Sequence, residues 1–179
     1  DCLLSRGLGD VYKRQDQDHT VELLRQGTVL GAVTTLDEPV QGCQIHALGS
    51  IRYAATCTPE FRERHFAKGV TAQALAQAPV LVFNRKDDMQ SRFARRMAGD
   101  DLPSTAPTWW IPSTRAFVQA NLGGMGWTMN PLPLVKRHLD AGRLVYVRQR
   151  AWEDVPLYWQ HWKGDVQTMA LLTRAVLDA

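Results

Sequence analysis

The feature that most constrains this chain is the alternation of short apolar runs with short amphipathic segments, separated by glycine and proline. The run 80–83 is typical of a buried strand. The segment 87–98 that follows it places Met89, Phe93 and Met97 at helical spacing on one face. Similar pairs of apolar run and amphipathic segment recur along the chain. This alternation predicts an α/β domain of mostly parallel sheet with flanking helices.

The individual elements are predicted from capping residues, helix-period stripes and apolar runs. Helices are expected over 21–26, from Pro59 onward, and over 72–78, 87–98, 117–122, 133–141 and 166–177. Strands are expected over 29–33, 44–48, 51–56, 80–83, 109–111, 127–129, 144–147 and 157–162. Gly49 is expected to interrupt the second and third of these strands, and 151–156 to form a connection before the last one.

The last predicted strand carries an aromatic run. Side chains alternate between the two faces of a strand, so Tyr158, Gln160 and Trp162 should share one face. Trp159 and His161 should share the other. At least one of these two sets is expected to pack in the core rather than to stack on bases or sugars.

Composition narrows the class of protein. The chain has 179 residues, enough for one mid-sized domain or for two small lobes of one domain. Its 21 lysines and arginines against 18 acidic residues give a net charge of +3, too small an excess to indicate a nucleic-acid surface. No apolar run approaches the ~20 residues that span a bilayer, and the three cysteines show no zinc-binding or disulfide-scaffold spacing. A cytoplasmic protein without membrane contact is therefore expected.

Residues 1–15 do not fit a signal peptide, because the apolar stretch 2–4 is too short and no small-residue cleavage site follows it. The string resembles translated sequencing-adapter sequence rather than protein sequence. We therefore expect 1–15 to be a non-native artefact, with the native chain truncated at Asp16.

A search for catalytic motifs gives no strong candidate. The sequence holds no GxSxG motif, no phosphate-binding loop and no glycine-rich turn after a strand. Its five histidines are scattered singly, so neither a nucleophile–base pair nor a metal site is predicted, and no cofactor is expected. A small α/β enzyme stays an alternative only if folding brings Cys57 or Ser113 within hydrogen-bond reach of a histidine.

Polar side chains follow four of the predicted strands, at the ends where open α/β sheets bind small molecules. These side chains are Thr34 and Thr35, Asp87 and Asp88, Ser113 and Thr114, and Asn130. Ser113 and Asp87 would equally cap the helices that follow them, and the sequence leaves both roles open.

Short stretches in a characteristic order run through the chain after residue 15. They are DQDHT at 16–20, LRQG at 24–27, VLGAVT at 29–34, LG at 48–49, APV at 78–80, DDM at 87–89, AF at 116–117, GW at 126–127 and YW at 158–159. With these stretches the segment 16–179 resembles the effector-binding domain of LysR-type transcriptional regulators, in particular the ArgP/LysG branch that senses lysine and arginine.

The resemblance implies a two-lobed, periplasmic-binding-protein-like fold of type 2, with mostly parallel sheets and two crossover strands. Lobe I, incomplete at its start, would comprise 16–50 and 152–179, and lobe II would comprise 51–151. Members of the family carry an N-terminal winged helix-turn-helix, which is absent from this sequence, so contact with DNA is expected only through that missing domain. Their effector domains assemble with one another, which implies a homodimer or tetramer that uses 21–26 and an element of the second lobe.

The resemblance also implies that a basic amino acid, lysine or arginine, binds in the cleft between the lobes and controls transcription of amino-acid export or metabolism genes, without catalysis. Such a ligand needs carboxylates for its cationic end, and hydroxyls or backbone N–H groups for its own carboxylate. The candidates for the cationic end are Asp16, Asp18, Asp87 and Asp88. The candidates for the carboxylate and α-amino group are Thr34, Thr35, Ser113 and Thr114, with Asn130 as a further effector contact. The alternative from another class is a solute-binding protein of a transport system with the same two-lobe fold.

Overall fold

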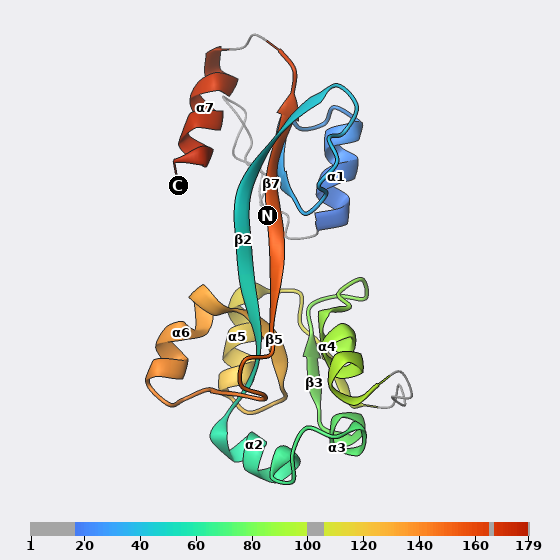
Figure 1. Ribbon diagram of the computed structural model, residues 1–179, viewed down its shortest axis with the longest axis vertical. Coiled ribbons are helices and arrows are strands. Elements are labelled where there is room, and N and C mark those ends of the chain that lie inside the picture. Colours follow the sequence, from blue (N-terminus) through green and yellow to red (C-terminus); the bar gives the residue numbers. More distant parts are fainter. Residues whose placement is uncertain (1–16, 100–105, 165–166, 179) are drawn as a thin grey trace, which may run out of the picture. The chain divides into compact units, whose positions relative to one another are not determined.

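The computed structural model describes residues 17–99, 106–164 and 167–178. The chain divides into two compact units (Figure 1). Of the described residues, unit 1 holds those up to residue 50 and those from residue 155 onward, and unit 2 holds those between 51 and 154. Two long strands, β2 (Cys43–Cys57) and β7 (Trp152–Trp162), run from one unit into the other. The predicted fold class, a two-lobed α/β fold with two crossover strands, is confirmed.

The remaining elements fall into one unit or the other. Unit 1 holds α1 (Gln17–Arg25), β1 (Gly31–Thr34) and α7 (Gln167–Leu177). Unit 2 holds α2 (Pro59–Phe66), α3 (Ala72–Gln77), β3 (Val80–Val82), α4 (Met89–Ala98), β4 (Thr108–Trp110), α5 (Thr114–Leu122), β5 (Thr128–Pro131), α6 (Leu132–Asp140) and β6 (Val145–Tyr146).

The strands pair in both directions. One sheet has the order β1-β7-β2-β5, with β6 also paired to β2, and a second sheet joins β3 to β4. Parallel pairing joins β3 to β4, and a parallel bridge joins Val80 to Trp127 just before β5. The ladders of the crossing strands with β1, β5 and β6 are antiparallel. The prediction of mostly parallel sheets therefore holds for β3 with β4 and for the bridge toward β5, and not for the ladders that β2 and β7 form with β1, β5 and β6.

Two local predictions were wrong. Gly49 does not interrupt a strand, because β2 continues through it with a φ of +96° that glycine adopts without strain. The segment 151–156 is not a connection, since β7 begins at Trp152. Because β2 and β7 are hydrogen-bonded neighbours, ladder pairing holds both backbones extended where the local sequence indicates a break.

The core of unit 1 forms on both faces of β7. The indole Nε1 of Trp162 donates to the Leu24 carbonyl at 3.1 Å, which ties α1 to the strand. The indole Nε1 of Trp159 donates to Thr173 Oγ1 at 3.0 Å, which ties α7 to it. Trp159 is buried and Trp162 half-buried. The predicted alternation of this aromatic run therefore places one tryptophan under each helix.

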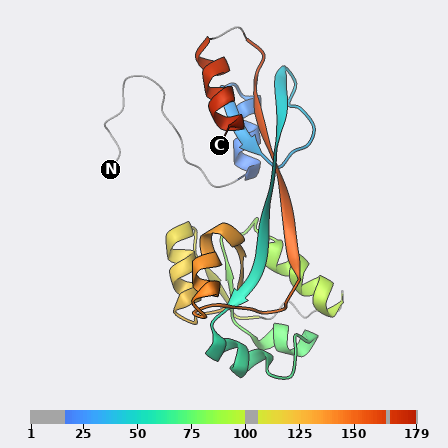
Figure 2. The same ribbon diagram turned by 60° about the vertical axis from the view of Figure 1, so that its left-hand side comes forward.

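The core of unit 2 forms on both faces of β3, all of whose residues are buried. Val80 and Val82 pack in a cluster with Phe93 of α4 and with Trp127, whose ring centroid lies 5.3 Å from that of Phe93. Leu81 packs instead with residues of α5. Figures 1 and 2 both show α4 on one side of the strands and α5 with α6 on the other. Burial on both faces explains why β3 is a continuous apolar run.

None of the helices in the described ranges is long and apolar enough to cross a membrane.

We expect Gly31→Ala to destabilise unit 1 by about 1–3 kcal/mol, the usual cost of overpacking a filled interior. A Cβ at Gly31 would come within 2.4 Å of Cη2 of the Trp159 ring. Gly164→Ala is the matched control, because nothing lies within 4 Å of a Cβ there. Urea unfolding followed by tryptophan fluorescence measures both variants. Equal unfolding midpoints would contradict close packing of Trp159 on β1.

Candidate functional site

The carboxyl ends of three strands of unit 2 lie along one edge. The strand β3 is parallel to β4, and the parallel bridge from Val80 to Trp127 sets β5 in the same direction. Three groups of predicted site residues follow these strands: Asp87 and Asp88 after β3, Ser113 and Thr114 after β4, and Asn130 near the end of β5. The fold therefore gathers five of the nine predicted residues at one edge, the usual place for a ligand in an open α/β sheet.

Asp87 is tied into the loop that precedes α4. Its Oδ2 accepts hydrogen bonds from the Phe83 backbone N–H at 3.1 Å and from Gln90 Nε2 at 3.3 Å. Its Oδ1 accepts from the Met89 backbone N–H at 3.2 Å. The N-cap position of α4 is Asp88, which makes no side-chain cap bond, while Asp87, one residue earlier, accepts from the N–H of the first helical residue Met89. Both oxygens of Asp87 already have donors.

Asp88 is more accessible. Its side chain is 57% exposed and forms an ion pair with Arg92, one turn along α4. Arg92 also pairs with Glu153 of the same unit, whose Oε1 lies 2.6 Å from Arg92 Nη2. An exposed pair of this kind costs little to open, so Asp88 is available to a cationic ligand.

Ser113 caps the helix that follows β4. Its backbone is extended and its Oγ accepts from the Ala116 N–H at 3.4 Å, so its predicted capping role is also real. Ser113 is exposed, and Thr114, the first residue of α5, is half-buried. The first turn of α5 holds no acidic residue. A helix N-terminus without an acid in its first turn favours an anion.

Asn130 belongs to a buried network of amides and a hydroxyl. Its Nδ2 donates to Thr56 Oγ1 and to Asn121 Oδ1, both at 3.0 Å. Thr56 Oγ1 donates to Asn121 Oδ1 at 2.9 Å, and Asn121 Nδ2 donates to the carbonyls of Thr56 and Gly126. Because carbonyls only accept, the orientation of the Asn121 amide is fixed, and that of Asn130 follows from it. Asn130 therefore holds β5 in place beside β2.

Three buried polar residues of this edge were missed by sequence reasoning: Thr56, Gln90 and Asn121. Gln90 Nε2 bridges Asp87 Oδ2 and Thr128 Oγ1, so it links the loop after β3 to β5. Asn121 lies four residues after the buried Phe117, on the inner face of α5. The helical spacing of apolar residues assigns position 121 to the core, and a polar residue at such a position is the sequence signal by which Asn121 could have been identified.

The other predicted residues lie in unit 1 or outside the described ranges. Thr34 is fully buried, and its Oγ1 accepts from Gln160 Nε2 at 3.2 Å. Thr35 is half-buried. Asp16 lies outside the described residues, and Asp18 lies on α1 with its side chain outside the description.

The structure gives no support to the enzyme alternative. Burial raises the pKa of the Cys57 thiol to about 12, so it is not a thiolate at neutral pH. Among the described residues, no group of three or more histidine, cysteine or acidic side chains could hold a metal ion.

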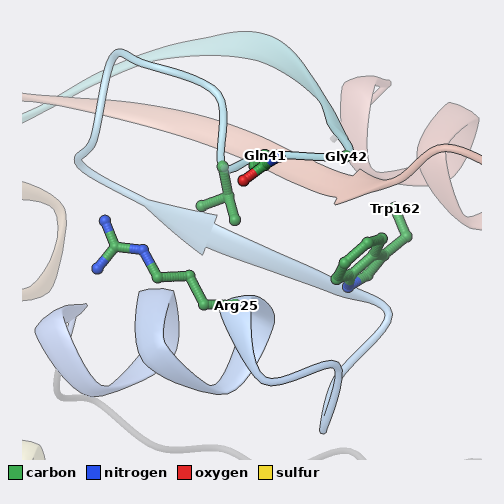
Figure 3. Close-up of a pocket in the computed structure, with 5 residues that line it drawn as sticks. Arg25, Gln41, Gly42 and Trp162 are labelled. Carbon is green, nitrogen blue, oxygen red and sulfur yellow. The ribbon is translucent and has the colours of Figure 1, made fainter.

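A hollow of about 560 Å³ lies on unit 1 (Figure 3). It is lined by Arg25, Val40, Gln41, Gly42 and Trp162. A Cβ at Gly42 would come within 2.8 Å of the Trp162 ring, so glycine is needed there for the indole to pack. The hollow is wide open, and we assign no ligand to it.

The sequence of this chain resembles those of known proteins. The sequence profile described as LysR substrate binding domain matches residues 13–167. The chain belongs to this family. The regulator LysG of Mycobacterium tuberculosis strain H37Rv is 42% identical over 176 residues, covering 97% of this chain and 57% of LysG. The regulator ArgP of Pseudomonas aeruginosa PAO1 is 35% identical over 163 residues, covering 91% of this chain and 53% of ArgP.

Solved structures agree with the LysR assignment. The C-terminal domains of a LysR family protein from Agrobacterium tumefaciens give a TM-score of 0.85 at 52% identity, covering 91% of this chain and 78% of that one. ArgP from M. tuberculosis gives 0.85 at 41% identity, covering 96% and 59%. Full-length LysG from Corynebacterium glutamicum with bound effector Arg gives 0.83 at 35% identity, covering 92% and 55%.

The predicted membership of the LysR family, ArgP/LysG branch, is thus confirmed, and the chain is a ligand-binding domain of LysG/ArgP type. These relatives are named as transcriptional regulators, in agreement with the prediction that the chain is not an enzyme. The chain spans between half and three-fifths of the length of the curated relatives that it matches.

Asp87→Asn is expected to lower the free energy of unfolding by about 1–2 kcal/mol, because an amide nitrogen would face one of the donors that Asp87 now accepts from. Asp88→Asn is expected to lower it by less than about 0.5 kcal/mol, because it removes an exposed ion pair only. Urea unfolding measures both. An equal or larger loss for Asp88→Asn would contradict the structural role given to Asp87.

Proposed function

We propose that this chain is the effector-sensing part of a LysG/ArgP-like regulator and that its effector is lysine or arginine. The observation that carries the proposal is the likeness to a LysG whose structure holds the effector Arg, at 35% identity and a TM-score of 0.83. The strand edge of unit 2 supports it, because this edge offers acids, hydroxyls and helix N-termini to a zwitterion with a cationic side chain.

The charges at the two helix starts suggest how such a ligand is oriented. Asp87 and Asp88 precede α4, so their negative charges would repel the carboxylate of the ligand and attract its cationic end. The start of α5 carries the neutral Ser113 and no acid in its first turn. We therefore assign the cationic end of the ligand to the Asp88 side of the edge, and the carboxylate to Ser113 and the N–H groups of α5.

The other predicted contacts stay part of the proposal with different roles. Thr34 is buried and bonded within unit 1, so it would position neighbours rather than bind charge. Asn130 is buried with its Nδ2 bonded and its Oδ1 without a partner, so it stays a candidate effector contact. Thr35 is half-buried, which leaves its side chain accessible. Asp16 and Asp18 remain candidates for the cationic end.

The whole regulator would act in the cytoplasm as a homodimer or tetramer, with DNA bound by a domain outside this chain. The names of the relatives give no support to the alternative of a transport solute-binding protein. The surface that we propose for contact with a second copy is the edge strand β4, where Trp109 and Trp110 are 50% and 54% exposed. Two adjacent exposed indoles on an edge strand are a costly surface to leave in water.

Ligand binding is tested by calorimetric titration of lysine, arginine and norleucine into the chain. Norleucine matches the carbon skeleton of lysine and lacks its charged amine, so we expect saturable heat from lysine or arginine and none from norleucine. Asp88→Asn should weaken binding by at least about tenfold, a loss of about 1.4 kcal/mol. Asp140→Asn is the matched control, because Asp140 is also an exposed acid paired one turn away, with Lys136. Equal heat from norleucine, or no heat with any ligand from folded protein, would overturn the proposed effector.

Self-association is tested by sedimentation of a Trp109→Ser, Trp110→Ser double variant. If β4 contacts a second copy, the double variant should weaken dimerisation by at least about tenfold, since buried tryptophans dominate interface energies. Leu134→Ser on α6 is the control, because Leu134 is 44% exposed outside this strand. A dimer of unchanged affinity in the double variant would exclude β4 from the interface.

A further inference from the structure

Two histidines that lie 115 positions apart in the sequence meet in unit 1. His46 comes from β2 and His161 from β7, and their Nε2 atoms are 3.3 Å apart. Their ring planes lie within 7° of parallel. From this geometry we propose that His46 and His161 form a two-histidine site for a divalent transition-metal ion such as Zn²⁺, Ni²⁺ or Cu²⁺.

The hydrogen bonding of His161 prepares its Nε2 for a metal. Its Nδ1 lies 3.0 Å from the backbone carbonyl oxygen of Trp162. Because a carbonyl oxygen only accepts, Nδ1 carries the proton and Nε2 presents its lone pair. An imidazole held by a carbonyl at one nitrogen and open at the other is the usual arrangement of a metal-ligating histidine. Without metal, the proton on His46 Nε2 fills the space between the two rings.

The separation of the two nitrogens matches a shared ion. Two imidazole nitrogens bound to one Zn²⁺ at about 2.0–2.1 Å, with a tetrahedral angle between them, lie about 3.3 Å apart. The ring centroids are 5.4 Å apart, so the rings face each other almost end to end. Each ring must turn by about 35° for both lone pairs to meet at one tetrahedral ion beside the line that joins the nitrogens. His46 then binds as the neutral tautomer with its proton on Nδ1, so its Nε2 proton moves through solvent to Nδ1 as the ion binds.

Burial and ligand type set the class of ion. His161 is buried, whereas His46 is half-buried, so an ion can arrive from solvent and keep water at its remaining positions. Imidazole suits Zn²⁺, Ni²⁺ and Cu²⁺, while Mg²⁺ and Ca²⁺ prefer oxygen ligands. Two histidines are the protein ligands that the described part of the chain brings to this site, and for a two-histidine site we expect micromolar affinity.

A metal at this site would act on the crossing strands. The two histidines stand on β2 and β7, so one ion would cross-link these strands within unit 1. This site holds none of the residues assigned to the amino-acid effector, so the metal-site proposal can be tested independently of the proposed function.

The test is calorimetric titration of ZnCl₂ into the tag-free 179-residue chain at pH 7.5. We expect one equivalent to bind with a micromolar dissociation constant, and His46→Asn to weaken that binding by at least about tenfold. His65→Asn is the control, because His65 is a half-buried histidine of unit 2 that packs on Phe61. Binding that is unchanged in His46→Asn, or absent from the folded chain, overturns the proposal.

A second measurement does not depend on the folding of a variant. The electron paramagnetic resonance spectrum of one equivalent of Cu²⁺ on the unmodified chain should show coupling to two imidazole nitrogens, and His161→Gln should reduce this to one. Coupling to a single nitrogen in the unmodified chain overturns the shared site.

Discussion

The buried amide of Gln160 holds the loop between β1 and β2 to the strand β7. Its Oε1 accepts from the Val40 backbone N–H at 2.8 Å. Its Nε2 donates to the carbonyls of Leu36 and Glu38, at 3.0 and 3.1 Å, and to Thr34 Oγ1. A loop of this kind has no ladder partners, so a side chain must satisfy its backbone groups. Without Gln160 the N–H of the buried Val40 would lose its partner, at about 1–3 kcal/mol.

Unit 2 uses the same device at the opposite end of β2. There Asn121 reaches from α5 to the carbonyls of Thr56 and Gly126, and Gln90 reaches from α4 to Thr128. Thr128 Oγ1 in turn donates to the Leu81 carbonyl at 2.9 Å. The Asn121 amide is bonded at both its oxygen and its nitrogen, so it admits one arrangement only and fixes the register of the strands on which it acts. Gln90 is bonded through its Nε2, and its buried Oε1 has no partner. The strand edge that carries Asp88 and Ser113 is therefore rigid, as a binding site on strand ends should be.

Local sequence signals predicted most helices and strands, whereas pairing between distant strands determined where strands continue and which side chains meet. Ser113 was correctly predicted as a helix cap, because a cap acts within three residues, although α5 begins at Thr114 and not at the expected residue 117. Phe93 was placed in the core by helical spacing alone. The continuity of β2 through Gly49 and the contact of His46 with His161 could not be predicted, because each depends on a partner strand more than a hundred residues away. Likewise, the pattern indicated that Asp87 follows a strand but not that its oxygens are already bonded.

Bond lengths distinguish the candidate residues that are free to bind a ligand from those that are committed to the fold. The cap from Ala116 N–H to Ser113 Oγ is 3.4 Å long, beyond the 2.7–3.2 Å of most N–H···O bonds, so it is weak and a ligand carboxylate could replace it at little cost. Asp87 accepts three bonds of 3.1–3.3 Å, one of them from the loop backbone at Phe83. Rotation of this carboxylate toward a ligand would break the hydrogen bond from the Phe83 N–H that holds the loop. The capping and binding roles can therefore coexist at Ser113. At Asp87 three acceptor positions of the carboxylate are already used within unit 2, so a ligand cation would have to share this carboxylate with the loop.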